Sequence, residues 1–326
     1  MKKKYKPIDL KNVKTFPLED RPTKVKSSDF AQLCPVNPNF TEFLDSLPDI
    51  LKARELRAVV DAIVGATELQ KPVVIGVGGH VIKCGLSPLI IQLMTEGVIT
   101  GVAMNGGASI HDFELGLIGR TSEDVASSLE SGMFGMVRET GESMNHAIKL
   151  GSERGMGLGE SLGSRLIEID PPFVQYSILA TGKRLGIPVT VHIAIGGDTI
   201  HMHPNAAGSA LGDTSFIDFR LLTSILMDFN NGGVYLNLGS AVILPEVFLK
   251  ALNLARNLSS HKIEAFTTVN MDMLQHYRPL QNIVQRPTKT VGNGYSITGH
   301  HEIMIPLLFH AVLAKLKINC KGRSKP

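Results

Sequence analysis

The chain has 326 residues, of which 43% are apolar and 19% are charged, with 32 glycines and no tryptophan. This apolar content allows a large buried core, and low charge with many glycines is typical of buried parallel strands joined by tight turns. The formal net charge of +3 comes from two basic ends, residues 1–7 and 315–326. Because no basic stripe with interleaved aromatic residues is present, we expect no nucleic-acid partner.

Cysteine usage and hydropathy narrow the cellular setting. Cys34, Cys84 and Cys320 have the spacing of neither a disulfide framework nor a zinc signature. This pattern indicates a reducing compartment, and we expect a cytoplasmic protein. No apolar run reaches membrane-spanning length, and the basic start lacks the apolar stretch of a secretory signal, so we expect no membrane association.

The first part of the chain changes from irregular to periodic. Residues 1–38 have scattered proline and lysine and predict a basic arm that lies on a neighbouring subunit. Residues 39–68 have apolar residues at helical spacing. A buried-type strand at 73–77 ends at Gly78, Ser87 and Pro88 then open a helix that runs to Glu96, and residues 98–104 form the next strand. This order predicts one βαβ unit.

The same alternation continues towards the end of the chain. It predicts a helix from Asp170 to about Arg184, a strand at 189–195, a helix at 214–227, a strand at 234–238, a helix opened by Pro245, a strand at 263–269 and a closing helix at 303–316. Strands that alternate with helices predict an α/β fold with one large, mostly parallel sheet, Rossmann-like, and helices on both faces. We expect a single domain over 39–316, followed by a basic tail at 317–326.

Glycine-rich strand ends point to a nucleotide. In such sheets ligands bind beyond the carboxyl ends of the strands, and glycine lets the backbone approach a pyrophosphate closely. Three predicted strands end in such turns, at Gly76–Gly79, Asn105–Gly107 and Gly196–Gly197. However, the first turn is an incomplete G-x-G-x-x-G, and the second strand ends at Asn105 rather than at an acidic residue. A plain dehydrogenase is therefore disfavoured.

Two polar clusters follow these turns. His111 and Asp112 lie at a helix start, where they either face a ligand or, in the case of Asp112, cap a helix. Asp198, His201 and His203 follow the 189–195 strand and either bind a divalent metal or position a polar substrate. A metal needs further ligands, which the segment from His300 to Glu302 supplies only if folding brings it close, so we predict no metal.

Read in order, several segments resemble the deoxyhypusine synthase family over residues 70–312. The similar segments are Leu86–Ile90 (a helix start), Met104–Glu114 (a Gly-Gly turn and the acidic stretch after it), Leu185–Val189 (a helix end that leads into a strand), Leu238–Val242 (a later glycine turn) and Ile305–Leu308 (the closing helix). The resemblance implies the NAD-binding fold of that family and NAD as the cofactor. It also implies a homotetramer.

That family takes hydride from spermidine with NAD, and a lysine then forms an imine with the butylamine fragment and passes it to a protein acceptor. The resemblance implies a small-molecule amine substrate and a protein acceptor for this chain. Lys289 is the nearest match to the catalytic lysine, and Asp198 with His201 fills the place of the segment that holds the nicotinamide end and spermidine. A lysine acts in this way only when its amine is partly unprotonated.

The resemblance assigns the remaining site residues. Residues implied for the cofactor are Ser87, Asn105, Gly106, Gly107, Asp112, Gly196, Gly197, Gly239 and Ser240. Residues implied for the substrate are His111, His203, Glu246, Asp272 and His300, of which the carboxylates suit a polyamine cation.

Three alternatives stay open. The segment from His111 to Ser122 also resembles the nucleotide domain of NAD-dependent ornithine cyclodeaminases, which likewise oxidise an amine to an imine. A metal-assisted enzyme that uses Asp198, His201 and His203 is the second alternative. The third is a non-catalytic paralogue, because the family's tryptophan beside the catalytic lysine is absent and Leu244–Glu246 replaces its substrate-binding histidines.

Overall fold

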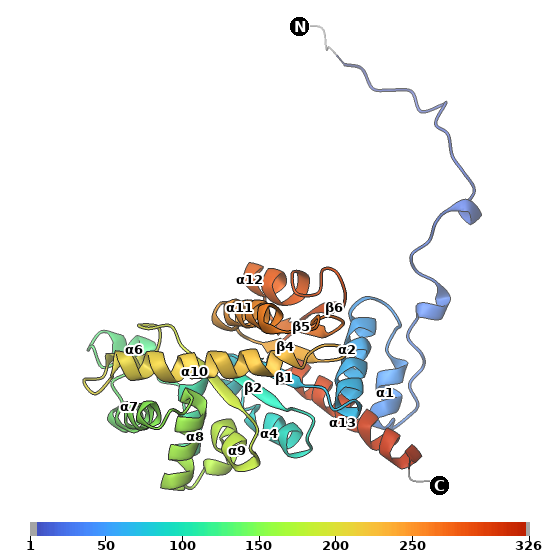
Figure 1. Cartoon of the computed structure of the whole chain (residues 1–326). Helices are drawn as coiled ribbons and strands as arrows, with labels where there is room; N and C mark the ends of the chain where they lie inside the picture. Colours follow the sequence, from blue (N-terminus) through green and yellow to red (C-terminus); the bar gives the residue numbers. More distant parts are fainter. Residues whose placement is uncertain (1–4, 324–326) are drawn as a thin grey trace.

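The computed structural model describes residues 5–323, excluding the side chains of 318–323, and contains one six-stranded parallel sheet. The strands are β1 (Val73–Val77), β2 (Gly101–Asn105), β3 (Val189–His192), β4 (Val234–Leu238), β5 (Thr267–Asp272) and β6 (Asn293–Thr298). Their order across the sheet is β3-β2-β1-β4-β5-β6 (Figure 1). The predicted parallel α/β fold is confirmed, and the strand order reverses between β1 and β4, as in doubly wound dinucleotide-binding folds.

Alternation along the strands divides the interior into two cores. Val73, Ile75 and Val77 of β1 face one core, whereas Val74 faces the other. Helices packed on the first core are α2 (Leu51–Glu68), α4 (Ser87–Thr95), α5 (Gly106–Ile118), α7 (Arg138–Glu153), α8 (Leu158–Ile169), α9 (Ile178–Leu185) and α13 (His301–Arg323). The second core is covered by α10 (Gly208–Met227), α11 (Ile243–Leu258) and the π-helical η5 (Leu280–Gln285). Figure 1 shows α11 and α4 on opposite sides of the strands.

Short elements complete the chain. They are α1 (Phe40–Ser46), α3 (Gly79–Lys83), α6 (Val125–Leu129), α12 (Tyr277–Pro279) and the 3-10 helices η1 (Leu18–Asp20), η2 (Ser27–Asp29), η3 (Val174–Tyr176) and η4 (Thr199–Met202). Residues 5–38 extend away from the body of the molecule (Figure 1), and all are exposed except the half-buried Asp29. That this arm lies on a neighbouring subunit stays a prediction.

The two ends of the chain fall partly outside the description. Residues 1–4 of the predicted arm and 324–326 of the predicted tail lie outside the described residues. The rest of the predicted tail continues α13 as far as Arg323. Within 5–323, no helix combines the length and the apolar character that crossing a bilayer requires.

Several helix and strand ends differ from the predicted ones because local hydrogen bonds and backbone conformation override the apolar pattern. Asp170 ends α8 in a left-handed conformation (φ 45°) instead of opening a helix, and α9 begins only at Ile178. β2 begins at Gly101, because Val98 donates its backbone N–H to Leu93 in the turn that closes α4. β6 was not predicted, because this edge strand is polar and mostly half-buried and has no apolar run.

The buried carboxylate of Asp112 attaches α5 to α9. It accepts hydrogen bonds from Ser177 Oγ at 2.6 Å, from Ile178 N at 2.8 Å and from Leu179 N at 3.1 Å. Burial raises the pKa of Asp112 to about 6, although these three donors act in the opposite direction. Asp112 is fully buried, so the predicted cofactor contact is corrected: its carboxylate caps a helix inside the protein.

We expect Asp112→Ala to lower the free energy of unfolding by about 2 kcal/mol or more, because it leaves three buried donors without an acceptor. Denaturant unfolding of the purified protein measures this cost. Asp124→Ala is the matched control, since Asp124 caps the exposed α6 through Ala126 N and its loss should cost less than about 1 kcal/mol. Equal costs in the two variants would contradict the assignment.

Candidate functional site

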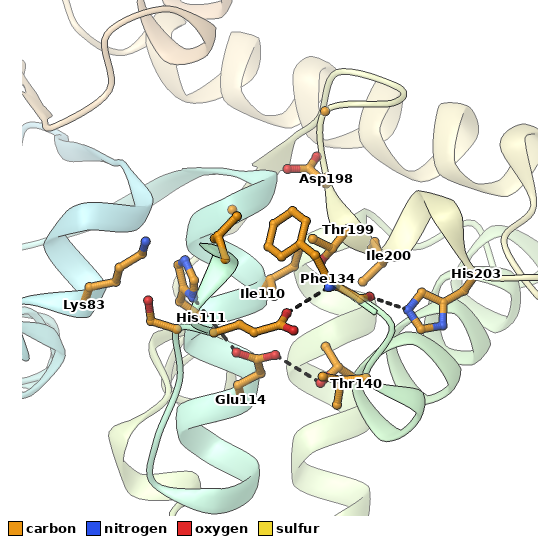
Figure 2. A pocket seen from close by; sticks show the side chains of 17 residues that line it. Lys83, Ile110, His111, Glu114, Phe134, Thr140, Asp198, Thr199, Ile200 and His203 are labelled. Carbon is orange, nitrogen blue, oxygen red and sulfur yellow. Dashed lines mark hydrogen bonds and ion pairs between the residues drawn. The ribbon is translucent and has the colours of Figure 1, made fainter. Parts of the chain in front are cut away.

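A cavity of about 200 Å³ lies beyond the carboxyl ends of β2 and β3 (Figure 2). One wall is α5, which begins immediately after β2 and presents Gly107, Ile110, His111 and Glu114 at helical spacing on one face. The second wall is the segment after β3, with Gly197, Asp198 and His203 among its residues. The third is the segment between α5 and α7, with Glu123, Phe134 and Gly135, continued by Thr140 in the first turn of α7, and Lys83 of α3 closes the side nearest β1.

His111 is held in one orientation by a short chain of polar contacts. Its Nδ1 lies 2.7 Å from Thr121 Oγ1, and the Thr121 hydroxyl donates to Glu114 Oε2. Glu114 also accepts a hydrogen bond from the hydroxyl of Thr140 at 3.1 Å. Because a carboxylate only accepts, the Thr121 oxygen is left to accept from Nδ1–H of His111. The hydrogen on Nδ1 leaves a lone pair on Nε2.

The surroundings of His111 keep it neutral. Burial lowers its pKa to about 4, and the nearby ammonium of Lys83 acts in the same direction. In Figure 2 the Lys83 side chain extends towards the His111 ring at the edge of the cavity. A neutral imidazole with a lone pair on Nε2 has the protonation state of a general base at neutral pH.

Asp198 lies over the first residue of α5. A Cβ placed on Gly106 would be 2.0 Å from Asp198 Oδ2, so only glycine allows this approach. Burial raises the pKa of Asp198 to about 6, and its carboxylate is 4.0 Å from His201 Nε2. The loop after β3 thus brings an acidic group to the end of β2, where the sequence has Asn105. The Asn105 side chain caps α5 by accepting from Ala108 N at 2.8 Å.

His203 and Glu123 hold the loop that carries Phe134 and Gly135. The Nε2 of His203 lies 2.9 Å from the carbonyl oxygen of Gly135, and Glu123 Oε2 accepts from Gly135 N at 2.8 Å. His203 is buried, so its predicted role as a substrate ligand changes to that of a side chain that holds a cavity wall.

The predicted cluster of Asp198, His201 and His203 does not form a metal site. His201 Nδ1 accepts from Gly196 N at 3.2 Å, which turns His201 towards its own loop, while His203 contacts Gly135. Within residues 5–323, no group of three or more His, Cys, Asp or Glu side chains has a geometry that could hold a metal ion. His201 also does not line the cavity.

A second polar group lies where the strand order reverses. Gly78 N donates to Leu238 O at 2.9 Å, so the turns after β1 and β4 touch, and a Cβ on Gly239 (φ 66°) would be 2.6 Å from His301 Nε2. Asp272 ends β5, and its Oδ1 is 3.8 Å from His301 Nε2. Ser240 is buried, with an Oγ that accepts from Leu244 N at 3.2 Å. Its hydroxyl is therefore used within the turn before α11.

Four predicted site residues lie elsewhere. Lys289 is exposed and precedes β6, so it lies at the amino edge of the parallel sheet, opposite the glycine turns, and it does not line the cavity. Its catalytic role stays a prediction. Glu246 forms ion pairs with Lys250 and, at 3.3 Å, with Arg278. Ser87 is buried in α4, and the exposed His300 is 3.9 Å from Glu302.

The sequence therefore predicted part of the cavity and missed the rest. His111, Asp198, Gly107 and Gly197 do meet in it. Lys83, Glu114 and Glu123 were missed. Glu114 carried a usable signal, because a helix after β2 places residues 107, 111 and 114 on one face, whereas Glu123 reaches the cavity only through the path of a loop.

Comparison with known proteins supports the fold. No family model matches the sequence, and no curated protein matches it. Among solved structures, ArgZ, an arginine dihydrolase of the cyanobacterial ornithine-ammonia cycle, has a TM-score of 0.51 at 14% identity over 80% of this chain and 31% of its own. An LOR/SDH protein from Methanococcus maripaludis S2 has a TM-score of 0.51 at 14% identity over 82% of this chain and 71% of its own.

The third of these structures contains a cofactor. AgrE, in a complex with ornithine and NAD+, has a TM-score of 0.51 at 13% identity over 81% of this chain and 33% of AgrE. This chain thus spans about a third of the length of ArgZ and AgrE. At these identities the likeness shows the fold alone. A protein described as a candidate deoxyhypusine synthase from Entamoeba histolytica reaches a TM-score of 0.49 at 11% identity, which leaves that resemblance a distant link at the level of the fold.

We expect Gly141→Ala to loosen the cavity wall. A Cβ on Gly141 of α7 would be 2.2 Å from His203 Nδ1, so the methyl group displaces His203 from Gly135 at a cost of about 1–3 kcal/mol. Chymotrypsin should then cleave faster near Phe134. Gly212→Ala is the control, because nothing lies within 4 Å of its Cβ in α10. If both variants are cleaved at the wild-type rate, His203 does not hold the loop.

Proposed function

We propose that this protein is an NAD-dependent enzyme that oxidises the carbon next to an amino group in a small basic amino acid. The observation that carries the proposal is the neutral, oriented His111 in a cavity lined by carboxylates, next to the strand-order reversal of a doubly wound sheet. Perturbed ionisable groups in a cavity at such a position are the expected signature of a reaction site.

The strand ends fit a dinucleotide. Gly78 and Gly239 meet at the reversal, and Gly106 and Gly107 begin α5 beside them. A Cβ on Gly79 would be 3.2 Å from His111 Cδ2 and 3.4 Å from Gly107, so the turn after β1 packs closely against the start of α5. Such glycines allow a pyrophosphate to approach N–H groups closely. When bound, NAD supplies the acceptor for a hydride.

His111 supplies the proton acceptor. As the C–H bond next to the amino group breaks and its electron pair leaves as hydride, the carbon–nitrogen double bond forms from the nitrogen lone pair. That lone pair is available only after the ammonium loses a proton, and His111 Nε2 is the neutral acceptor in the cavity. The products are an imine and the reduced cofactor, and water or a second amino group of the substrate can then add to the imine carbon.

The charges of the cavity select the substrate class. Asp198, Glu114 and Glu123 are acidic, and Lys83 is the cation at the edge of the same cavity. A basic amino acid has two amino groups for the carboxylates and one carboxylate for Lys83. A polyamine has no group for Lys83 and would be repelled by it. The observed charges therefore favour the amino-acid alternative over spermidine.

The aminobutyl transfer step is not part of the proposal. Transfer through a lysine requires that lysine beside the imine, and Lys289 lies at the opposite edge of the sheet. No role for a protein acceptor follows from the described cavity. A deaminating oxidation needs only water or the substrate's own second amine, and the groups that line the cavity are sufficient for it.

We expect the protein to reduce NAD when mixed with ornithine, lysine or arginine, and not with alanine or glutamate. Formation of NADH, followed by its absorbance, is the measurement.

His111→Gln should lower kcat by about a hundredfold or more, because proton transfer in the transition state is lost, while NAD still raises the Tm. His146→Ala, which changes an exposed histidine of α7, should leave kcat unchanged.

Two results would contradict the proposal. One is the absence of NADH with every amine, spermidine and putrescine included, together with no effect of NAD on the Tm. The other is full activity of His111→Gln, which would assign proton transfer to another group. A Tm that rises with NAD without turnover of any amine would favour the non-catalytic paralogue.

The pH dependence follows from the two shifted groups. Asp198 must be ionised to bind an ammonium group, so kcat/KM should fall as pH decreases through about 6, whereas His111 stays neutral to about pH 5 because its pKa is about 4. Asp198→Asn should abolish the decrease near pH 6 and raise KM about tenfold or more. Asp228→Asn, at an exposed carboxylate after α10, should keep the wild-type profile. An unchanged profile in Asp198→Asn would remove Asp198 from substrate binding.

A further inference from the structure

The two halves of the sheet differ in where they place a carboxylate. In a doubly wound fold, β1–β3 and β4–β6 are equivalent mononucleotide-binding halves, and an acidic residue that follows the second strand of one half takes the ribose hydroxyls. In the first half this position is Asn105, whose side chain caps α5. In the second half it is Asp272, the last residue of β5.

His301 lies directly beside Asp272. It is the first residue of α13, which follows β6, and its side chain is 1% exposed. Its Nε2 is 3.8 Å from Asp272 Oδ1 and would be 2.6 Å from a Cβ on Gly239. The ends of β4, β5 and β6 thus converge on one imidazole at the point of strand reversal.

Both ring nitrogens of His301 are buried without a hydrogen-bond partner among the described residues. A neutral imidazole has one donor and one acceptor, and leaving them unpaired in the interior costs free energy that the fold does not recover. Such an unsatisfied buried group at the carboxyl ends of the strands, where ligands bind in this fold, indicates a partner that arrives with the ligand. Hydroxyl groups, which both donate and accept, match the pair formed by an imidazole and a carboxylate.

We propose that the β4–β6 half binds the adenosine portion of NAD, with Asp272 and His301 holding its ribose hydroxyls. This inference rests on the proposed function, which places the amine beside His111, on the β2–β3 side. The hydride acceptor must then lie over the first half, and the adenosine is left to the second half. The cofactor therefore runs from β5 towards β2, opposite to the usual direction in this strand order.

His80 is the side chain that the adenosine displaces. It is exposed, it belongs to α3 directly after β1, and its ring centroid is 5.7 Å from that of His301. Cys84, one turn later, has its Sγ 3.5 Å from His80 Nε2. A rotation of exposed His80 opens His301 without moving a strand.

If NAD bound in the usual direction, Asp198→Asn and Asp272→Asn would have different effects on AMP binding from those that our proposal predicts. If adenosine bound over β1–β3, its ribose would lie at the end of β2, where Asp198 covers Gly106. Asp198→Asn would then weaken AMP, whereas our proposal assigns that effect to Asp272→Asn. Both substitutions keep the shape of the side chain, and an asparagine at 272 still accepts from Met273 N.

The test is calorimetric titration of the full chain with NAD and with AMP. We expect Asp272→Asn and His301→Leu to weaken both ligands about tenfold or more, and Asp198→Asn to leave AMP affinity unchanged. His301→Leu should not lower the Tm of the ligand-free protein, because it removes unpaired buried polar atoms. Tyr235→Phe is the matched control: its buried hydroxyl also lacks a partner, but its ring stacks on Phe248 beneath the sheet at 4.1 Å, so AMP affinity should not change.

The outcomes separate the two proposals. If wild type binds NAD but Asp198→Asn, and not Asp272→Asn, weakens AMP, the direction of the cofactor is the usual one and this inference is overturned while the proposed function stands. Wild-type affinities in both Asp272→Asn and His301→Leu also overturn it. If the wild-type protein binds neither NAD nor AMP, the proposed function fails, and the inference fails with it.

Discussion

The attachment of α5 to α9 by Asp112 is the constraint on which the site depends. Asp112 and His111 are neighbours on one helix, and they point to different sides of it. The carboxylate of Asp112 is fully buried against the start of α9, and this contact fixes the rotation of α5 about its axis. With that rotation fixed, residues 107, 110, 111 and 114 can only face the cavity. The interior hydrogen bonds of Asp112 therefore determine that the His111 side chain faces the cavity.

Side chains that are already used inside the fold also determine which carboxylate lies at the end of β2. Asn105 is used to cap α5, so the end of β2 has no acid of its own, and Asp198 from the next loop covers Gly106 instead. Burial raises the pKa of Asp198 to about 6, which means that the ionised form is disfavoured in this structure. An unpaired buried carboxylate is costly to the fold, and a cationic ligand would remove that cost. A cation bound at Asp198 would therefore stabilise the fold as well as occupy the cavity.

The sequence predicted the sheet well because buried parallel strands leave a strong signal. The run at 73–77 and the run at 234–238 coincide with β1 and β4, since both strands are covered on both faces and are almost wholly apolar. β6 was missed for the opposite reason: it is an edge strand, and Asn293, Gly294 and Ser296 give it no apolar pattern. Missing β6 also put Lys289 in the segment before the last helix, whereas in the structure that segment is Gly299 and His300 and Lys289 precedes β6.

The residues of the site were predicted only where they follow a strand directly. His111 and Asp198 do so, and each reaches the cavity by a fixed number of residues from a strand end. Thr121 and Glu123 depend on the path of a loop, which local sequence does not determine. His301 and Asp272 are 29 residues apart in sequence and meet only because β5 and β6 are adjacent. Strand order, which brings these ends together, is a property of the whole sheet and not of any one motif.

The segment between α5 and α7 forms one wall of the cavity and also contacts His111 through Thr121. Between α5 and α7 the chain contains Ser122, Gly132 and Gly135 in left-handed conformations, and α6 buries none of its residues. Its hydrogen bonds to the cavity walls are few, at Thr121 and Gly135, and regions with few buried contacts are the first parts of a fold to open. Thr121 begins the same loop that His203 holds at its far end. In the structure the two contacts are present together: His203 holds Gly135 at one end of this segment, and Thr121 at its other end holds His111 Nδ1.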